Sequence, residues 1–419
     1  MRETESNASP GWVRLVYGAA SGAVVAAILG FGLSAWFHML GLGLVVPSNG
    51  THSTISQFVG RAGLNFYAIH HISIAGAGMP GGIPGLTLSI LWPLTLWAAV
   101  PAIALALGGL VSAKLAGAKD AGRFTAGALV AIPYVIFLLI ARPFFTAATS
   151  AIHLPQFEIG GWNPAPELIA AKLIPAAGGT VFYGLIFGVI FGGIGALGGL
   201  AGVKKRLFGK DAWLPAWIRG ALISFLIGQL IFFCLFAVYI GIGLKGHTKA
   251  ERTERVKSAV TLLPAASGLA YYISHGVTIR GGASSTVDDE SGFKLSAGLI
   301  RGIETDGKKK HVPLLAYLTL IIPAVALVLG GYYAAKTSNK PVKKWPLAAG
   351  IAIAYAALMA LFAPLYMLIQ KSSFTIENVT NQAAITLGPS VPESFALGLV
   401  IALLFELIGI SIYRPHDHS

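Results

Sequence analysis

Long stretches of apolar residues without charge recur along this chain of 419 residues. Residues 124–141, 220–244 and 345–370 contain no Asp, Glu, Lys or Arg. A helix needs about 20 apolar residues to cross the roughly 30 Å hydrocarbon core of a bilayer. Only 11% of the residues are charged, less than half of the roughly 25% that soluble domains carry. The sequence therefore predicts a multi-pass membrane protein.

The expected fold is all-α, with about eight transmembrane helices and a small extracytoplasmic cap formed by the longer loops. The predicted spans cover residues 13–40, 87–113, 124–142, 174–202, 217–244, 313–335, 347–369 and 394–413. The first span is too long for a signal-peptide core, so it is expected to be retained. Because the chain has one cysteine, Cys234, neither an intrachain disulfide nor a thiolate cluster is expected.

The distribution of basic residues predicts the orientation of these spans. Lys and Arg gather in segments such as 203–210 and 336–344, and short cytoplasmic loops carry an excess of both residues. We therefore expect a cell-membrane location with both termini in the cytoplasm. The net charge of +13 then reflects topology and attraction to anionic lipid, and not nucleic-acid binding. The Ala- and Gly-rich composition favours a prokaryotic source.

Short matching segments indicate an internal repeat. PGWVR at 10–14 matches PAWIR at 215–219, and NFYAIHHISIAGAG at 65–78 matches LAYYISHGVTIRGG at 269–282. A third pair joins 101–115 to 323–337. The predicted domains are a first four-helix repeat at 1–203, a cytoplasmic linker at 204–216, a second repeat at 217–413 with an extracytoplasmic insertion at 245–312, and a tail at 414–419. Since each repeat has an even number of spans, the two should be parallel.

Glu406 is the only acidic residue within the predicted spans. A charge at mid-bilayer costs about 2.5–3.5 kcal/mol on insertion scales, so such residues usually face the protein interior. Gly398, Ala402 and Glu406 share one helical face, which small residues make suitable for close packing. Glu406 is thus a candidate proton, cation or ligand site. Alternatively, it is a structural carboxylic acid bonded to a neighbouring helix, with Gln229 as the candidate partner.

The second candidate site is a pair of histidines. The repeat alignment pairs His71 with His275 and Tyr67 with Tyr271. Paired imidazoles can bind a metal or haem or sense pH, although such histidines often only bond a loop. The two tyrosines are expected to be interface aromatics.

Three functions follow from these residues. The first is a transporter or permease for a small or amphipathic molecule, with its site at the repeat interface and Glu406 involved. The second is a non-transporting scaffold or accessory subunit whose extracytoplasmic cap binds another protein. The third is a haem- or metal-binding protein that uses His71 and His275. No cofactor is otherwise indicated, and the nucleotide, metalloprotease and hydrolase motifs are absent, so no enzyme is expected.

Overall fold

The structure is a computed structural model. It describes residues 11–39, 54–78, 87–93, 96–119, 121–148, 171–198, 214–243, 263–285, 294–300, 302–305, 308–338, 343–376 and 379–413. The chain divides into two compact units. Unit 1 takes most of the chain up to Lys204, and unit 2 takes Lys205 onward together with Ser89–Leu96. Each unit is described by itself.

Unit 1 is built on long apolar helices. Its α-helices are α1 (Gly11–Met39), α2 (Ile55–Ala68), α3 (Ala99–Leu115), α4 (Ala121–Ala128), α5 (Ala131–Ala141), α6 (Ala177–Phe187) and α7 (Gly193–Ala196). The 3-10 helix η2 (Arg142–Phe144) follows α5, and a π-helical segment, η5 (Gly188–Gly192), joins α6 to α7. The 3-10 helix η1 (Leu96–Ala98) leads into α3.

Unit 2 has the same kind of helical framework. Its helices are α9 (Ala216–Gly243), a helix at residues 263–274, α11 (Ile321–Lys336), α12 (Lys344–Phe362) and α13 (Val391–Ile412). The 3-10 helices η6 (Leu314–Leu320) and η7 (Ala363–Tyr366) lie before α11 and after α12.

Eight helices in the described part of the chain are long and apolar enough to cross a membrane. They run over Gly11–Met39, Leu96–Leu115, Gly122–Phe144, Ala177–Ala196, Ala216–Ile242, Ala316–Lys336, Lys344–Tyr366 and Val391–Ile412. Large apolar side chains such as Ile28, Ile140, Leu230 and Val400 are exposed on them. Such surfaces suit lipid and not water, so the chain is a multi-pass membrane protein.

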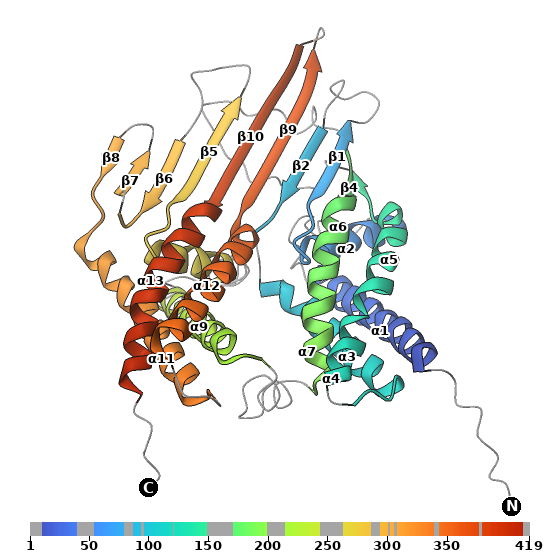
Figure 1. Cartoon of the computed structure of the whole chain (residues 1–419). Helices are drawn as coiled ribbons and strands as arrows, with labels where there is room; N and C mark the ends of the chain where they lie inside the picture. Colours follow the sequence, from blue (N-terminus) through green and yellow to red (C-terminus); the bar gives the residue numbers. More distant parts are fainter. Residues whose placement is uncertain are drawn as a thin grey trace, which may run out of the picture. The chain divides into compact units, whose positions relative to one another are not determined.

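The all-α prediction was wrong, because both units contain antiparallel strands. In unit 1, β4 (Ala171–Pro175) pairs with β1 (Ile74–Gly78) and with β3 (Ala147–Ala148). In unit 2 the strand order is β9-β10-β5-β6-β7-β8. These strands are β9 (Leu368–Ile376), β10 (Val379–Pro389), β5 (Ile279–Ser285), β6 (Lys294–Gly298), β7 (Gly302–Thr305) and β8 (Lys308–Lys310). They extend from one end of α12 and α13 (Figure 1).

Strands also correct several predicted boundaries. The span predicted at 87–113 starts with a strand, β2 (Thr87–Leu91), and helix begins only at η1. The span predicted at 174–202 likewise starts at the end of β4, and α6 begins at Ala177. Within the predicted insertion 245–312, which belonged to a cap expected to consist of loops, the described residues between 279 and 310 form four strands. These segments lie where the chain leaves a span, and pairing satisfies their backbone groups.

The last helix begins three residues earlier than predicted, at Val391. Glu393 therefore lies in its first turn, where a carboxylate is favoured by the helix dipole. It accepts hydrogen bonds from the Thr278 amide (3.0 Å) and from Arg280 (2.6 Å). Glu406 is thus not the only acidic residue in this span, but it is the buried one.

Candidate functional site

The carboxyl group of Glu406 lies inside unit 2, where α13 packs on α11 and α12 and the Glu406 side chain reaches Ser224 of α9. Its side chain is fully buried (0% exposed). Glycines on α11 make room for it: a Cβ on Gly331 would stand 2.7 Å from Oε2, and one on Gly330 would stand 3.1 Å from Oε1. The carboxyl group therefore depends on two successive glycines of a neighbouring helix.

The hydrogen-bond partner of Glu406 is Ser224 on α9, and not the predicted Gln229. The Ser224 hydroxyl lies 2.6 Å from Oε1 and also 3.1 Å from the Gly220 carbonyl oxygen. Oε2 has no hydrogen-bond partner among the described residues, and neither has Nε2 of Gln229.

Because the Ser224 hydroxyl has two acceptors within reach, it can bond the carboxyl group of Glu406 whether or not that group carries a proton. Toward a carboxylate, Ser224 donates to Oε1. Toward a carboxylic acid, Ser224 donates to Gly220 and accepts the acid proton, because a hydroxyl both donates and accepts. The arrangement satisfies Oε1 with or without a proton.

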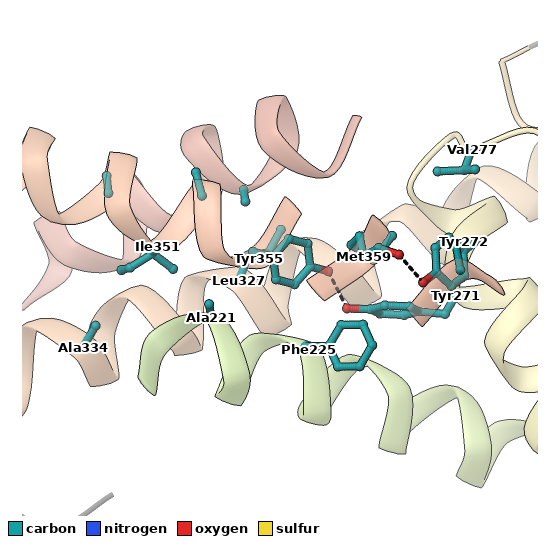
Figure 2. Packing of buried hydrophobic residues seen from close by; sticks show 14 of the residues in the cluster. Ala221, Phe225, Tyr271, Tyr272, Val277, Leu327, Ala334, Ile351, Tyr355 and Met359 are labelled. Atoms are coloured by element: carbon teal, nitrogen blue, oxygen red, sulfur yellow. Dashed lines mark hydrogen bonds between the residues drawn. The ribbon is translucent and has the colours of Figure 1, made fainter. Parts of the chain in front are cut away.

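A second polar group in unit 2 is a chain of three side chains, His275, Tyr355 and Tyr271. His275 Nδ1 lies 2.8 Å from the Tyr271 carbonyl oxygen, so this nitrogen donates. Nε2 then accepts from the Tyr355 hydroxyl at 2.6 Å, and the Tyr355 and Tyr271 hydroxyls are bonded to each other. Figure 2 shows these two hydroxyls pointing toward one another. Burial lowers the pKa of His275 to about 4, which fits the neutral acceptor.

Unit 1 contains the same histidine–tyrosine contact. His70 Nδ1 donates to the Phe66 carbonyl at 2.6 Å, and Nε2 accepts from Tyr134 at 2.7 Å. The histidine that makes this contact in unit 1 is His70, next to His71, which the predicted repeat pairs with His275.

A tyrosine in each unit also bonds a helix carbonyl. The Tyr67 hydroxyl donates to the Leu138 carbonyl in unit 1, as the Tyr272 hydroxyl donates to that of Met359 in unit 2. Phe66 precedes Tyr67 in the chain, and Tyr271 precedes Tyr272.

His71 occupies the left-handed position that ends helix α2. Its φ is +60°, and Gly276 with φ +76° takes the same position after helix 263–274. In both units the next residue donates back to the carbonyl five residues earlier: Ile72 to Tyr67, and Val277 to Tyr272. This is the Schellman pattern of helix ends. His71 also meets the ring of Tyr183 edge-on at 4.7 Å.

Replacing His71 by Gly is expected to leave the fold intact and to raise the free energy of unfolding by up to about 1 kcal/mol, because a non-glycine residue in this conformation costs roughly 1–2 kcal/mol. The measurement is thermal unfolding of the purified protein, with His71→Ala as the comparison. A glycine variant less stable than wild type would show that the imidazole contact outweighs the backbone strain.

The described part of unit 1 shows no buried acidic side chain like Glu406. Gly109 approaches the Gly192 carbonyl as Gly331 approaches that of Glu406, so Gly192 makes in unit 1 the backbone contact that Glu406 makes in unit 2. Gly22 approaches Gly108 on α3 as Gly220 approaches Gly330 on α11. In unit 2 the Ser224 hydroxyl, one helical turn after Gly220, bonds Glu406.

The two buried histidines should make stability depend on pH. Burial lowers the pKa of His70 and of His275 from 6.5 to about 4, so between these values the unfolded state binds more protons than the folded state. Stability should therefore fall as pH falls from about 6.5 to about 4. Thermal unfolding across this range tests the prediction. His275→Gln should flatten the dependence, and the exposed His311→Gln control should not.

The geometry argues against haem or metal ligation by His275, because both ring nitrogens are already hydrogen-bonded. The residues that the structure describes contain no group of three or more His, Cys, Asp or Glu side chains placed to hold a metal ion.

Sequence reasoning singled out Glu406, Tyr271 and His275 but missed Ser224, Tyr355 and His70. Ser224 could have been identified from the sequence, because it lies four residues from Gly220 and from Gly228 on the small-residue face of its helix. No protein-family model, curated protein or solved structure matches this chain.

Proposed function

We propose that the protein is a membrane transporter or permease for a small or amphipathic molecule, in which Glu406 is a proton-binding group. The observation that carries this proposal is the buried carboxyl group, bonded on one oxygen to Ser224 and unpartnered on the other within the described residues. Ionisable groups within membrane spans are costly and commonly mark ion pathways or proton relays.

The comparison between units supports a functional role for the site. We infer that the units descend from one duplicated helical module, since both keep the His–Tyr contact and the tyrosine bond to a helix carbonyl. A module that packs with Gly192 does not need a carboxyl group at this position for packing. Glu406 is thus best explained by a use other than stability.

Currents from proteoliposomes on a solid-supported membrane test the proposal. The full chain is reconstituted, a pH gradient is imposed, and a panel of small organic cations, anions and neutral amphiphiles is applied. At least one compound should give a proton-dependent current with wild type, and Glu406→Gln should lower that current by about 100-fold or more, the lower end of what a positioned acid or base contributes.

Glu393→Gln is the matched control, since Glu393 lies on the same helix but bonds the Thr278 amide and Arg280. This control should keep the current. Equal currents from wild type and Glu406→Gln, for every active compound, would refute a proton-binding role for Glu406.

A further inference from the structure

Strand β8 of unit 2 consists of three exposed lysines, Lys308, Lys309 and Lys310. It is the last strand in the order of its sheet and pairs with β7. After β8 the chain leads into η6 and α11 (Figure 1). The expected orientation puts the far end of α11, at Lys336, in the cytoplasm. The positive-inside bias therefore does not account for lysines before the near end of this helix.

The register of the strands divides these lysines between two faces of the sheet, because successive side chains of a strand point to opposite faces. Lys309 lies opposite Glu304, and their charged groups are 3.9 Å apart. On the same face, Ser296 lies opposite Glu304, and Arg280 lies opposite Ser296. Arg280 forms an ion pair with Glu393 at 2.6 Å. We call this side of the sheet the ion-pair face.

The other side, which we call the lysine face, combines basic and apolar side chains. The register places on it Ile279, Leu295, Ala297, Ile303, Thr305, Lys308 and Lys310. Ile303 is 36% exposed, and no ion pair is found for Lys308 or Lys310 among the residues that the structure describes. Lysine on an edge strand also hinders pairing with another sheet. That role does not require apolar neighbours on one face and ion pairs on the other.

Strands β6 to β8 are held against the start of a membrane span. The hydroxyl of Tyr317, the second residue of that span, donates to the Leu299 carbonyl at 2.9 Å. Leu299 precedes β7 by three residues, so Gly302 at the start of β7 is at most about 11 Å away. A Cβ on Gly302 would stand 3.1 Å from the Lys310 carbonyl oxygen. The edge of the lysine face therefore lies near the start of the span.

Large apolar side chains are exposed around this point. Ile300, between β6 and β7, is 72% exposed, and Leu314 and Leu318 of η6 are 85% and 57% exposed. Such side chains suit acyl chains, and lysine extends its ammonium group from an apolar surface toward a polar layer. Basic segments beside a membrane helix attract anionic lipids.

We propose that the lysine face and the first turn of η6 form a binding surface for an anionic phospholipid. Lys308 and Lys310 bind the headgroup phosphate as point charges. Ile300, Ile303 and Leu314 contact the acyl chains next to the glycerol. This surface is separate from Glu406 and its partner Ser224, and its use does not depend on transport.

Photo-crosslinking in vesicles tests the surface. The full chain is reconstituted in phosphatidylcholine with a small fraction of phosphatidylglycerol that carries a diazirine near its glycerol, or with the same fraction of an equivalent phosphatidylcholine. After illumination, mass spectrometry of chymotryptic peptides measures the lipid adducts on residues 294–321. Wild type should give more adducts with phosphatidylglycerol than with phosphatidylcholine, and high salt should reduce the difference. Lys308→Gln/Lys310→Gln should lower the phosphatidylglycerol adducts by about tenfold, equivalent to about 1.4 kcal/mol of binding.

Lys294→Gln/Lys309→Gln is the matched control. It removes the same charge from the ion-pair face, on which Lys294 also lies, opposite Gly282, and it should keep the wild-type yield. All four lysines are exposed, so both double variants should fold. Equal yields from the two lipids on wild type would overturn the proposal and leave the surface to an acidic protein partner. Equal losses in the two double variants would also overturn it. Neither outcome bears on Glu406, so a failure here is distinct from a failure of the proposed function.

Discussion

Glu406→Met is expected to stabilise the protein and to abolish proton-driven transport. Methionine has a similar length and no polar atom that needs a partner, and volume-conserving replacements are the best tolerated in a core. A buried polar group without a partner costs about 1–3 kcal/mol, and this cost applies to Oε2 of Glu406. Ser224 keeps the Gly220 carbonyl as an acceptor. The free energy of unfolding should therefore rise by about 1 kcal/mol or more, while the proton-dependent current disappears.

A lower free energy of unfolding in Glu406→Met would instead favour a structural role for the carboxyl group. If the carboxyl group mainly joined α13 to α9, its removal would destabilise the protein, and transport would be lost only together with the fold. Unfolding measured in detergent, beside currents from proteoliposomes made with the same preparation, separates the two. Ser224→Ala is the companion variant, because it removes the donor to Oε1 and keeps the carboxyl group.

Gly22→Val is expected to prevent unit 1 from packing. A Cβ on Gly22 would meet the Gly108 carbonyl group on α3, and would stand 2.9 Å from Cγ2 of Val130. Overpacking costs about 1–3 kcal/mol and sometimes more, and here the obstacle is backbone that cannot rotate away. The measurement is the yield of monodisperse protein in detergent together with its unfolding temperature.

Gly32→Val on the same helix is the matched control. Gly32 has no atom within 4 Å of the position of a Cβ, and valine forms helix better than glycine. This control should fold as well as wild type. Equal behaviour of the two variants would contradict the close approach of α1 and α3.

The membrane spans could be predicted because a long, uncharged apolar segment is compatible with few structures other than a membrane helix. The charges at Arg142, Lys344 and Lys371 bound the runs and so place the helices within a few residues. The strands were missed because their apolar and polar residues were taken for loop. Residues 368–376 and 379–389 carry β-branched and alternating residues separated by two positions, which is a hairpin pattern that sequence reasoning had available.

The exact contacts of the site were beyond the sequence. Aligning identical letters put His71 opposite His275, whereas the histidine that bonds a tyrosine in unit 1 is His70. The contacts of a ring depend on its place at the helix end, which letter identity does not give. The alignment of the first helices also slips: Gly22 and Gly220, which make matching contacts with α3 and α11, are 198 positions apart, whereas PGWVR and PAWIR are 205 positions apart. Which side chain meets Glu406 depends on that register.

The most direct measurement is an infrared titration of the purified full chain from acid to alkaline pH, with Glu406→Gln subtracted. If Glu406 binds and releases a proton in the folded protein, the difference spectra should show a carboxylic-acid band giving way to carboxylate bands as the pH rises. Difference spectra that do not change with pH would mean that this carboxyl group holds one protonation state throughout, and a proton-binding Glu406 would be contradicted.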